Sequence, residues 1–131
     1  MPETLREIAD RHRVELLLRF GSTVMGATHP RSDLDLGVLL RDPELGFDRL
    51  GALQADLQDH FRDRRVDLAV LNRADPLFLK KVLERCELLV GDPTRLAELR
   101  CYAFRRYVDH RRFLDLEREW IRRRLGVAKA Q

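Results

Sequence analysis

Two short apolar runs separated by one helical segment constrain the fold of this 131-residue chain most. Residues 33–40 and 65–71 are rich in leucine and valine and have the length of strands, whereas residues 45–62 carry leucines at helical spacing. A strand, a helix and a strand in this order favour two parallel, neighbouring strands joined by a right-handed crossover. The rest of the chain predicts two more strands, over 14–20 and 86–90. It also predicts three more helices, over 3–13, from Pro76 onward, and from the N-cap candidate Thr94 to Leu125.

These elements predict an α/β or α+β fold, with a small four-stranded sheet, flanking helices and a long C-terminal helical segment. The length suffices for one domain with a core and not for two. Thr4 and Glu7 have the spacing of a capping box at the start of the first helix. Phe47 is expected to pack at the start of its helix. The last helix, for which a break near Asp109 is an alternative, should carry one apolar stripe formed by Leu96, Leu99, Ala103, Tyr107, Leu114, Ile121 and Leu125.

Charge and hydropathy exclude several classes of protein. The chain has no apolar run near the roughly 20 residues that cross a bilayer, which excludes a helical membrane protein. Its first residues lack the apolar centre of a secretory signal, so we expect a cytoplasmic location with both cysteines reduced. Residues 95–131 hold eleven basic and five acidic residues. This basic segment favours a solvated helix face, and a surface for nucleic acid or another acidic partner is the alternative.

Asp33 and Asp35 are the most informative residues of the sequence. They are two apart at the start of an expected strand and therefore project from the same face. Two carboxylates so close repel each other unless a divalent cation offsets their charge, and carboxylates are the ligands that Mg²⁺ prefers. A solvated strand end with two surface aspartates is the alternative.

Asp67 lies inside the expected strand 65–71, where a carboxylate is unusual. If this strand is the neighbour of 33–40, Asp67 can lie beside Asp35. Three acidic groups on one face would suit a two-metal site, with Asp67 bridging or orienting a nucleophile or acting as its general base. Gly21 and Ser22 end the first strand in a turn that could present backbone N–H groups to a phosphate, although such pairs are also common in ordinary turns.

Gly21-Ser22, ten residues, then Asp33-x-Asp35 resembles the signature of the nucleotidyltransferase superfamily that has the DNA polymerase β-like palm. The single-domain length, the strand bearing Asp67 and the final helix are similar to the minimal nucleotidyltransferases, the MntA-like antitoxins. The resemblance implies one nucleotidyltransferase domain over 1–131, with a catalytic palm of mixed sheet over 1–92 and a partner-facing helical segment over 93–125.

The same resemblance implies an activity and a partner. AMP would pass from ATP to a hydroxyl, typically of a tyrosine, on a HEPN-domain RNase toxin, with Mg²⁺ as the cofactor. Asp33, Asp35 and Asp67 would be the catalytic residues and metal ligands. The nucleotide would be bound by Gly21, Ser22, Arg31 and Ser32. Arg31 is included because this chain has Thr23-Val24-Met25 where many relatives carry an arginine after the Gly-Ser pair; a solvated loop residue is its alternative reading.

Three other functions remain open from the sequence. The chain could neutralise its partner by binding alone, with a palm that does not turn over. It could adenylylate a small molecule, although such enzymes usually carry a further substrate-binding domain. Direct binding of nucleic acid would depend only on the basic C-terminal segment and is not expected.

Overall fold

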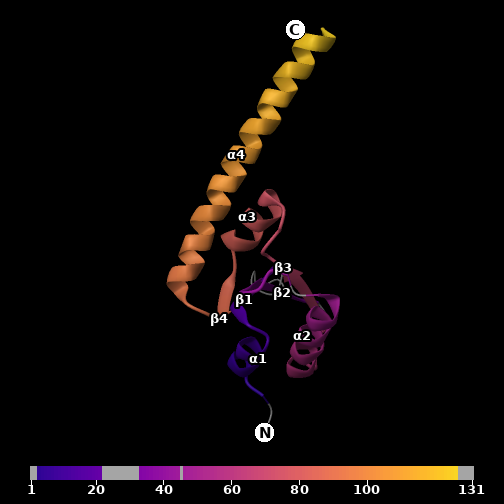
Figure 1. Ribbon diagram of the computed structural model, residues 1–131, viewed down its shortest axis with the longest axis vertical. Coiled ribbons are helices and arrows are strands. Elements are labelled where there is room, and N and C mark those ends of the chain that lie inside the picture. Colours follow the sequence, from indigo (N-terminus) through magenta and orange to yellow (C-terminus); the bar gives the residue numbers. More distant parts are fainter. Residues whose placement is uncertain (1–2, 22–32, 45, 127–131) are drawn as a thin grey trace.

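A computed structural model of the chain describes residues 3–21, 33–44 and 46–126, which fold into four helices and four strands (Figure 1). In chain order the elements are α1 (Leu5–Arg11), β1 (Val14–Phe20), β2 (Leu34–Leu40), α2 (Phe47–His60), β3 (Val66–Val70), α3 (Pro76–Glu84), β4 (Glu87–Val90) and α4 (Pro93–Leu125). Each expected element is present, and the bounds differ from the expected ones by a few residues at most.

The four strands form one mixed sheet in the order β3-β2-β1-β4. Strand β1 pairs antiparallel with β2 and with β4, whereas β2 and β3 are parallel. The parallel pair joined by α2 is the crossover that the sequence predicts. The α/β fold with a small mixed sheet and a long C-terminal helix is therefore confirmed.

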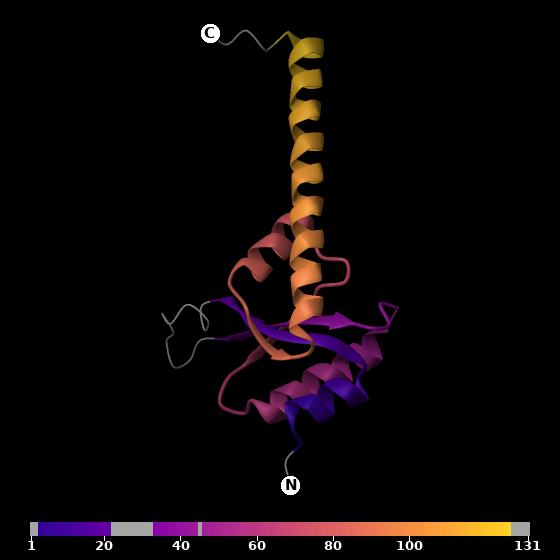
Figure 2. The same ribbon diagram turned by 90° about the vertical axis from the view of Figure 1, so that its left-hand side faces the viewer.

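Helices cover both faces of the sheet (Figure 2). One face packs against α1 and α2 through aliphatic side chains that include Leu36, Leu53 and Leu57. The other face packs against α3 and the first turns of α4, with Leu16 and Leu18 of β1 at its centre. Because successive residues of a strand point to opposite faces, β2 contributes to both layers.

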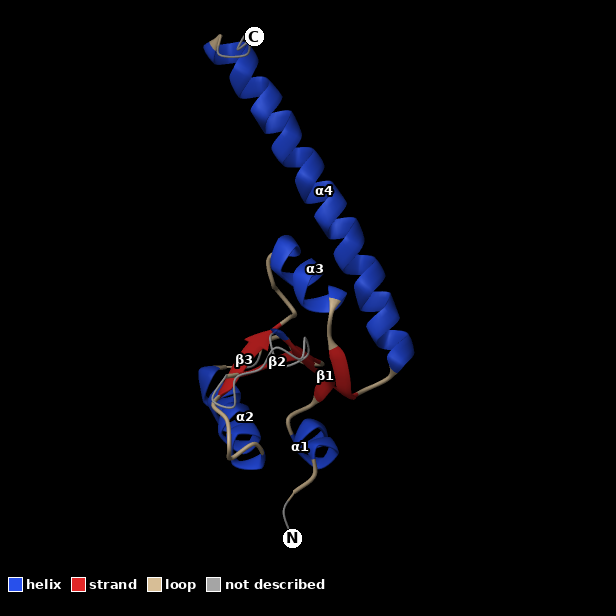
Figure 3. Cartoon of the chain, turned by 180° about the vertical axis from the view of Figure 1, so that it is seen from behind, coloured by secondary structure: helices blue, strands red, loops and turns tan. Residues whose placement is uncertain are grey.

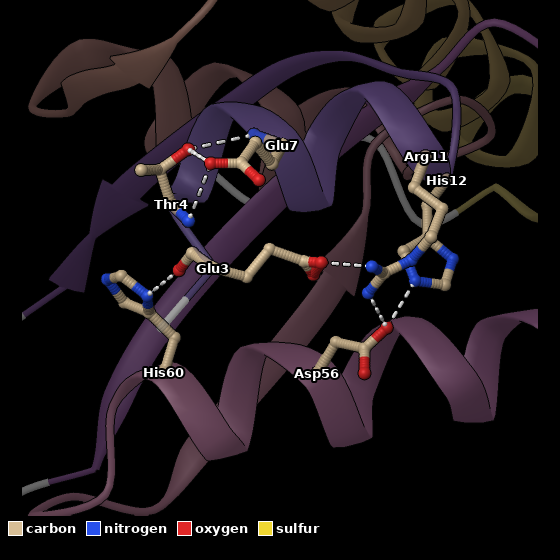
Figure 4. A network of polar contacts seen from close by, with 7 residues as sticks. All are labelled: Glu3, Thr4, Glu7, Arg11, His12, Asp56 and His60. Atoms are coloured by element: carbon tan, nitrogen blue, oxygen red, sulfur yellow. Dashed lines mark hydrogen bonds and ion pairs between the residues drawn. The ribbon is translucent and has the colours of Figure 1, made fainter. Parts of the chain in front are cut away.

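Polar contacts fasten α1 to α2 at the edge of the first layer (Figure 4). The carboxylate of Asp56 on α2 lies 2.6 Å from His12 Nε2 and accepts a hydrogen bond of 2.6 Å from Arg11. Thr4 and Glu7 form the capping box that their spacing predicts. The pKa of Asp56 is lowered, mainly by its hydrogen bonds with His12 and Arg11.

Helix α4 begins two residues earlier than expected and projects far beyond the sheet (Figures 1 and 3). Its N-cap is Asp92, whose side chain accepts a hydrogen bond of 2.9 Å from the Thr94 N–H, so the assignment of Thr94 as the cap was wrong. Pro93 at the first helical position explains the difference, because proline fits that position and has no N–H to lose. The helix continues without a break through Asp109.

Only the first part of the expected α4 stripe is buried. Leu96, Leu99 and Ala103 join the core, whereas every residue from 109 to 126 is exposed. The far members of the stripe, Leu114, Ile121 and Leu125, therefore have no core to enter. Phe47 is also 92% exposed, which corrects its expected packing role. No helix within the described residues is long and apolar enough to span a membrane.

Candidate functional site

The register of the parallel strands brings Asp67 next to Asp35. The two residues are directly paired in the β2–β3 ladder, and Leu34 and Leu36 pair with Val66 and Leu68 on either side. Paired residues of neighbouring strands project from the same face of a sheet. Asp35 and Asp67 therefore share the face that packs against α3 and α4, and Asp33, two residues before Asp35, lies at the same edge.

The charge of each aspartate acts on the others. The pKa of Asp35 is raised, first by its partial burial, then by the negative charges of Asp67 and Asp33. Such a shift means that the ionised form of Asp35 is disfavoured where it stands. A cation placed among these carboxylates would remove the repulsion.

The end of β1 closes against the same aspartate. Phe20 pairs with Asp35 across the antiparallel ladder, and the next residue, Gly21, has a left-handed φ of 81°. A Cβ atom at Gly21 would overlap a carboxylate oxygen of Asp35. Glycine is therefore favoured at this position for two reasons, its left-handed backbone conformation and the close approach of the Asp35 side chain.

The chemistry of these donors fits Mg²⁺ bound together with a substrate. Among the residues that the structure describes, no three His, Cys, Asp or Glu side chains converge into a ready-made metal site. Mg²⁺ is commonly held by one or two carboxylates, with water and substrate phosphates completing its shell. The adjacent Asp35 and Asp67, with Asp33 at the same edge, would supply such ligands.

Several predicted site residues fall outside the described part of the chain. Ser22, Arg31 and Ser32 belong to the segment 22–32, of which the structure gives no description. Their predicted contacts to the nucleotide remain predictions.

A pocket beside the aspartates was not found from the sequence. It has a volume of about 300 Å³, lies between α3 and the end of β1, and includes Gly21 in its lining. Helix α3 contributes Phe78, Lys81, Val82 and Glu84, and its C-cap residue Arg85 also lines the pocket. The signal was present, because positions 78, 81, 82 and 85 have the spacing of one helix face.

Comparisons with solved structures give the same fold. One match is a toxin-antitoxin crystal structure with AMP-PNP, at 23% identity and a TM-score of 0.67, covering 91% of this chain and 93% of the other. Another is a crystal structure of the toxin-antitoxin MntA-HepT, at 21% identity and a TM-score of 0.60, covering 91% of each chain. A third contains the tri-AMPylated HEPN toxin of Shewanella oneidensis with its MNT antitoxin, at 21% identity and a TM-score of 0.61, covering 91% of this chain and 90% of the other.

Sequence comparisons identify the family. No curated protein sequence matches the chain significantly. The family model described as "Polymerase beta, Nucleotidyltransferase" matches residues 3–94, which is well over half of the chain and contains all three aspartates. The chain is therefore a nucleotidyltransferase of the polymerase beta family.

Proposed function

We propose that this protein transfers AMP from ATP to a hydroxyl group, that of a tyrosine, on a cognate HEPN RNase toxin and so acts as an antitoxin. The observation that carries the proposal is the pairing of Asp67 with Asp35 in the β2–β3 ladder. This pairing gathers carboxylates from two strands beside the end of β1, where Gly21 approaches Asp35. The family supports nucleotidyl transfer, and the similar complex with a tri-AMPylated HEPN toxin supports the choice of AMP and of the partner.

The proposed reaction is a displacement at the α-phosphorus of ATP. The oxygen of the acceptor hydroxyl forms a bond to that phosphorus, and the bond from the phosphorus to the oxygen bridging to the β-phosphate breaks. Pyrophosphate leaves with the electron pair of the broken bond. Asp67 orients the acceptor hydroxyl and accepts its proton, because it lies at the strand position next to Asp35 and is exposed to an incoming substrate.

Asp33, Asp35 and Asp67 would hold Mg²⁺, which when bound neutralises charge on the phosphates and lowers the pKa of an attacking hydroxyl. The raised pKa of Asp35 supports this assignment, since the carboxylate carries a charge that the site alone does not compensate. Gly21, Ser22, Arg31 and Ser32 would bind the phosphates of the nucleotide. Because no three carboxylates converge within the described residues, we expect Mg²⁺ to bind weakly without nucleotide.

We also propose that two segments of the single domain of residues 1–131 have different functions. Residues 1–92 form the catalytic palm, and the helical segment 93–125 faces the partner. The projecting part of α4 supports this division, because it exposes large apolar side chains that a monomer would normally bury, including Phe113, Leu116 and Trp120. Since ATP is the proposed substrate, we place the activity in the cytoplasm.

Labelled ATP tests the proposal. The chain is incubated with Mg²⁺, ATP labelled at its α-phosphate and the HEPN protein encoded beside it. We expect label on that protein, and loss of label with Asp33→Asn and with Asp35→Asn. The control is Asp59→Asn, which alters an exposed carboxylate of α2.

The RNase activity of the partner separates transfer from the alternatives. If both variants neutralise the toxin as well as the native chain does, binding alone accounts for the antitoxin. If the native chain labels a small hydroxyl compound and never the HEPN protein, the acceptor is a small molecule. Either result would contradict the proposal.

A further inference from the structure

The pocket between α3 and the end of β1 lies next to the proposed reaction centre. We infer that it holds the base of the nucleotide, which stacks on Phe78, and that Lys81 faces the phosphates. This inference rests on the proposed function and names the residues of α3 that would bind its substrate.

Gly21 connects the pocket with the aspartates. It lines the pocket, and it also lies so close to the Asp35 carboxylate that a side chain at Gly21 would overlap it. A nucleotide whose α-phosphate is held at Asp35 would therefore have this pocket beside it, on the side of Gly21. The volume of about 300 Å³ is at the lower end of the range of small-molecule sites.

The aromatic lining suits a planar ring. Phe78 and Phe20 pack edge to face, with ring centroids 6.0 Å apart and planes at 85°. This contact fixes the Phe78 ring against the end of β1, while 42% of the residue stays exposed. A held, exposed aromatic ring is the kind of platform on which bases stack, and any base can use it because each has a π face.

The charges in the pocket suit a polyanion. Lys81 lies one turn after Phe78 on the same face of α3, and Arg85, the C-cap residue of the helix, also lines the pocket. The carboxylate of Glu84 also lines the pocket, but it forms an ion pair with Lys80 on the neighbouring turn. Cations here would supply positive charge for the phosphates, which the Thr23-Val24-Met25 sequence after the Gly-Ser pair does not provide.

The same features argue against the acceptor tyrosine as the occupant. A tyrosine ring could also stack on Phe78, but it carries no negative charge for Lys81 and Arg85 to bind. A nucleoside triphosphate matches both features of the lining, because its base can stack on Phe78 and its phosphates can bind the cations.

Calorimetric titration of the full chain with two probes tests the inference. The probes are ATP with Mg²⁺ and inorganic tripolyphosphate with Mg²⁺, which has the phosphates without a base. We expect Phe78→Ala to weaken ATP about tenfold and to leave tripolyphosphate unchanged. Lys81→Ala should weaken both probes several-fold. The controls are Phe47→Ala and Arg49→Ala, which alter exposed side chains of α2 and should change neither affinity.

A tryptophan substitution gives an independent readout if Phe78→Ala disturbs the fold. The chain has one tryptophan, Trp120, so Phe78→Trp in a Trp120→Phe background leaves the introduced indole as its sole reporter. We expect ATP to quench its fluorescence and tripolyphosphate not to do so, with ATP affinity retained.

The outcomes separate the inference from the proposed function. If the native chain binds ATP and Phe78→Ala binds it equally well, or if the loss is the same for both probes, the base subsite is wrong while the transfer activity stands. If the native chain binds no ATP even with Mg²⁺ and the partner present, the proposed function itself fails.

Discussion

The two faces of β2 differ in what their side chains do for the protein. Leu34, Leu36 and Val38 point into the layer made by α1 and α2 and are almost completely buried. On the other face, at the same end of the strand, lies Asp35, and Asp33 directly precedes the strand. One face of the strand thus contributes aliphatic side chains to the core. The other carries a carboxylate whose ionised form is disfavoured.

Two carboxylates, one in each layer, differ in the same way in their surroundings. Asp56, at the edge of the α1–α2 layer, is hydrogen-bonded to His12 and Arg11, and its pKa is lowered. Asp35 faces other carboxylates, and its pKa is raised. The first carboxylate stabilises the fold in its charged form, whereas the second stores repulsion that a bound cation would relieve.

The largest effect is expected from removing the charge of Asp35. We expect Asp35→Asn to reduce AMP transfer about 10²- to 10³-fold, the loss typical of one group that stabilises developing charge. The same variant should be no less stable than the native chain, because it removes a desolvated and repelled charge. Transfer rates and thermal unfolding together check this, and a variant that loses activity only because it unfolds would contradict it.

On the opposite face, truncating the core should cost stability and leave the chemistry intact. Leu57 is fully buried in the core between α1, α2 and the sheet, so we expect Leu57→Ala to lower the free energy of unfolding by about 2–5 kcal/mol. Leu116→Ala is the matched control, since Leu116 is 71% exposed on the projecting part of α4 and should cost less than about 0.5 kcal/mol. Urea unfolding measures both values, and equal losses would show that the assigned core is wrong.

A methyl group at Gly21 should damage both properties. Gly21→Ala places a Cβ against the Asp35 carboxylate and in a left-handed conformation that costs about 1–2 kcal/mol. We expect a corresponding loss of stability and a loss of transfer as Asp35 is displaced. Unfolding and transfer assays would contradict the described contact if the variant were indistinguishable from the native chain.

The smallest effect is the pH dependence, and its sign differs between the two carboxylates. Asp56 has a lowered folded pKa, so its stabilisation is present above the unfolded pKa of about 3.9 and is lost as the pH falls through the folded value. Asp35 has a raised folded pKa, so its ionisation destabilises the fold as the pH rises from the unfolded to the folded value.

Matched variants measure these signs. Asp56→Asn should lower the free energy of unfolding at pH 7 by less than about 1 kcal/mol, because the pair is partly exposed, and the difference should vanish in acid. Asp35→Asn should give a difference of the opposite sign that also vanishes in acid. Equal signs for the two variants would contradict the assigned environments.

Local rules in the sequence predicted the centre of the molecule well. The crossover rule placed Asp67 beside Asp35, because it makes the strand after α2 a parallel neighbour of β2, and the Thr4–Glu7 capping box formed as expected. The bounds of the strands followed from apolar runs ended by turn residues. The capping box and the strand bounds depend on residues close together in the chain. The position of Asp67 depends on one strand pairing, that of β2 with β3.

The wrong predictions concern residues whose burial depends on how far the sheet and its covering helices extend. The spacing of Leu114, Ile121 and Leu125 continues the stripe of α4, but periodicity does not reveal that the sheet has ended below them. The pocket at Phe78 was missed for a related reason, since the pattern from Pro76 onward predicted a helix but not the elements that surround it. Whether a second face of α3 lines a cavity depends on where the end of β1 lies, and β1 is distant in the sequence.

The role of Asp67 is the central claim, and the rate of AMP transfer by Asp67→Asn tests it most directly. Asp63→Asn is the matched control, because Asp63 is an exposed carboxylate in the turn before β3. We predict that Asp67→Asn loses transfer at least about a hundredfold while Asp63→Asn keeps the native rate. A native rate in Asp67→Asn, with the fold intact, would contradict a reaction centre shared by β2 and β3.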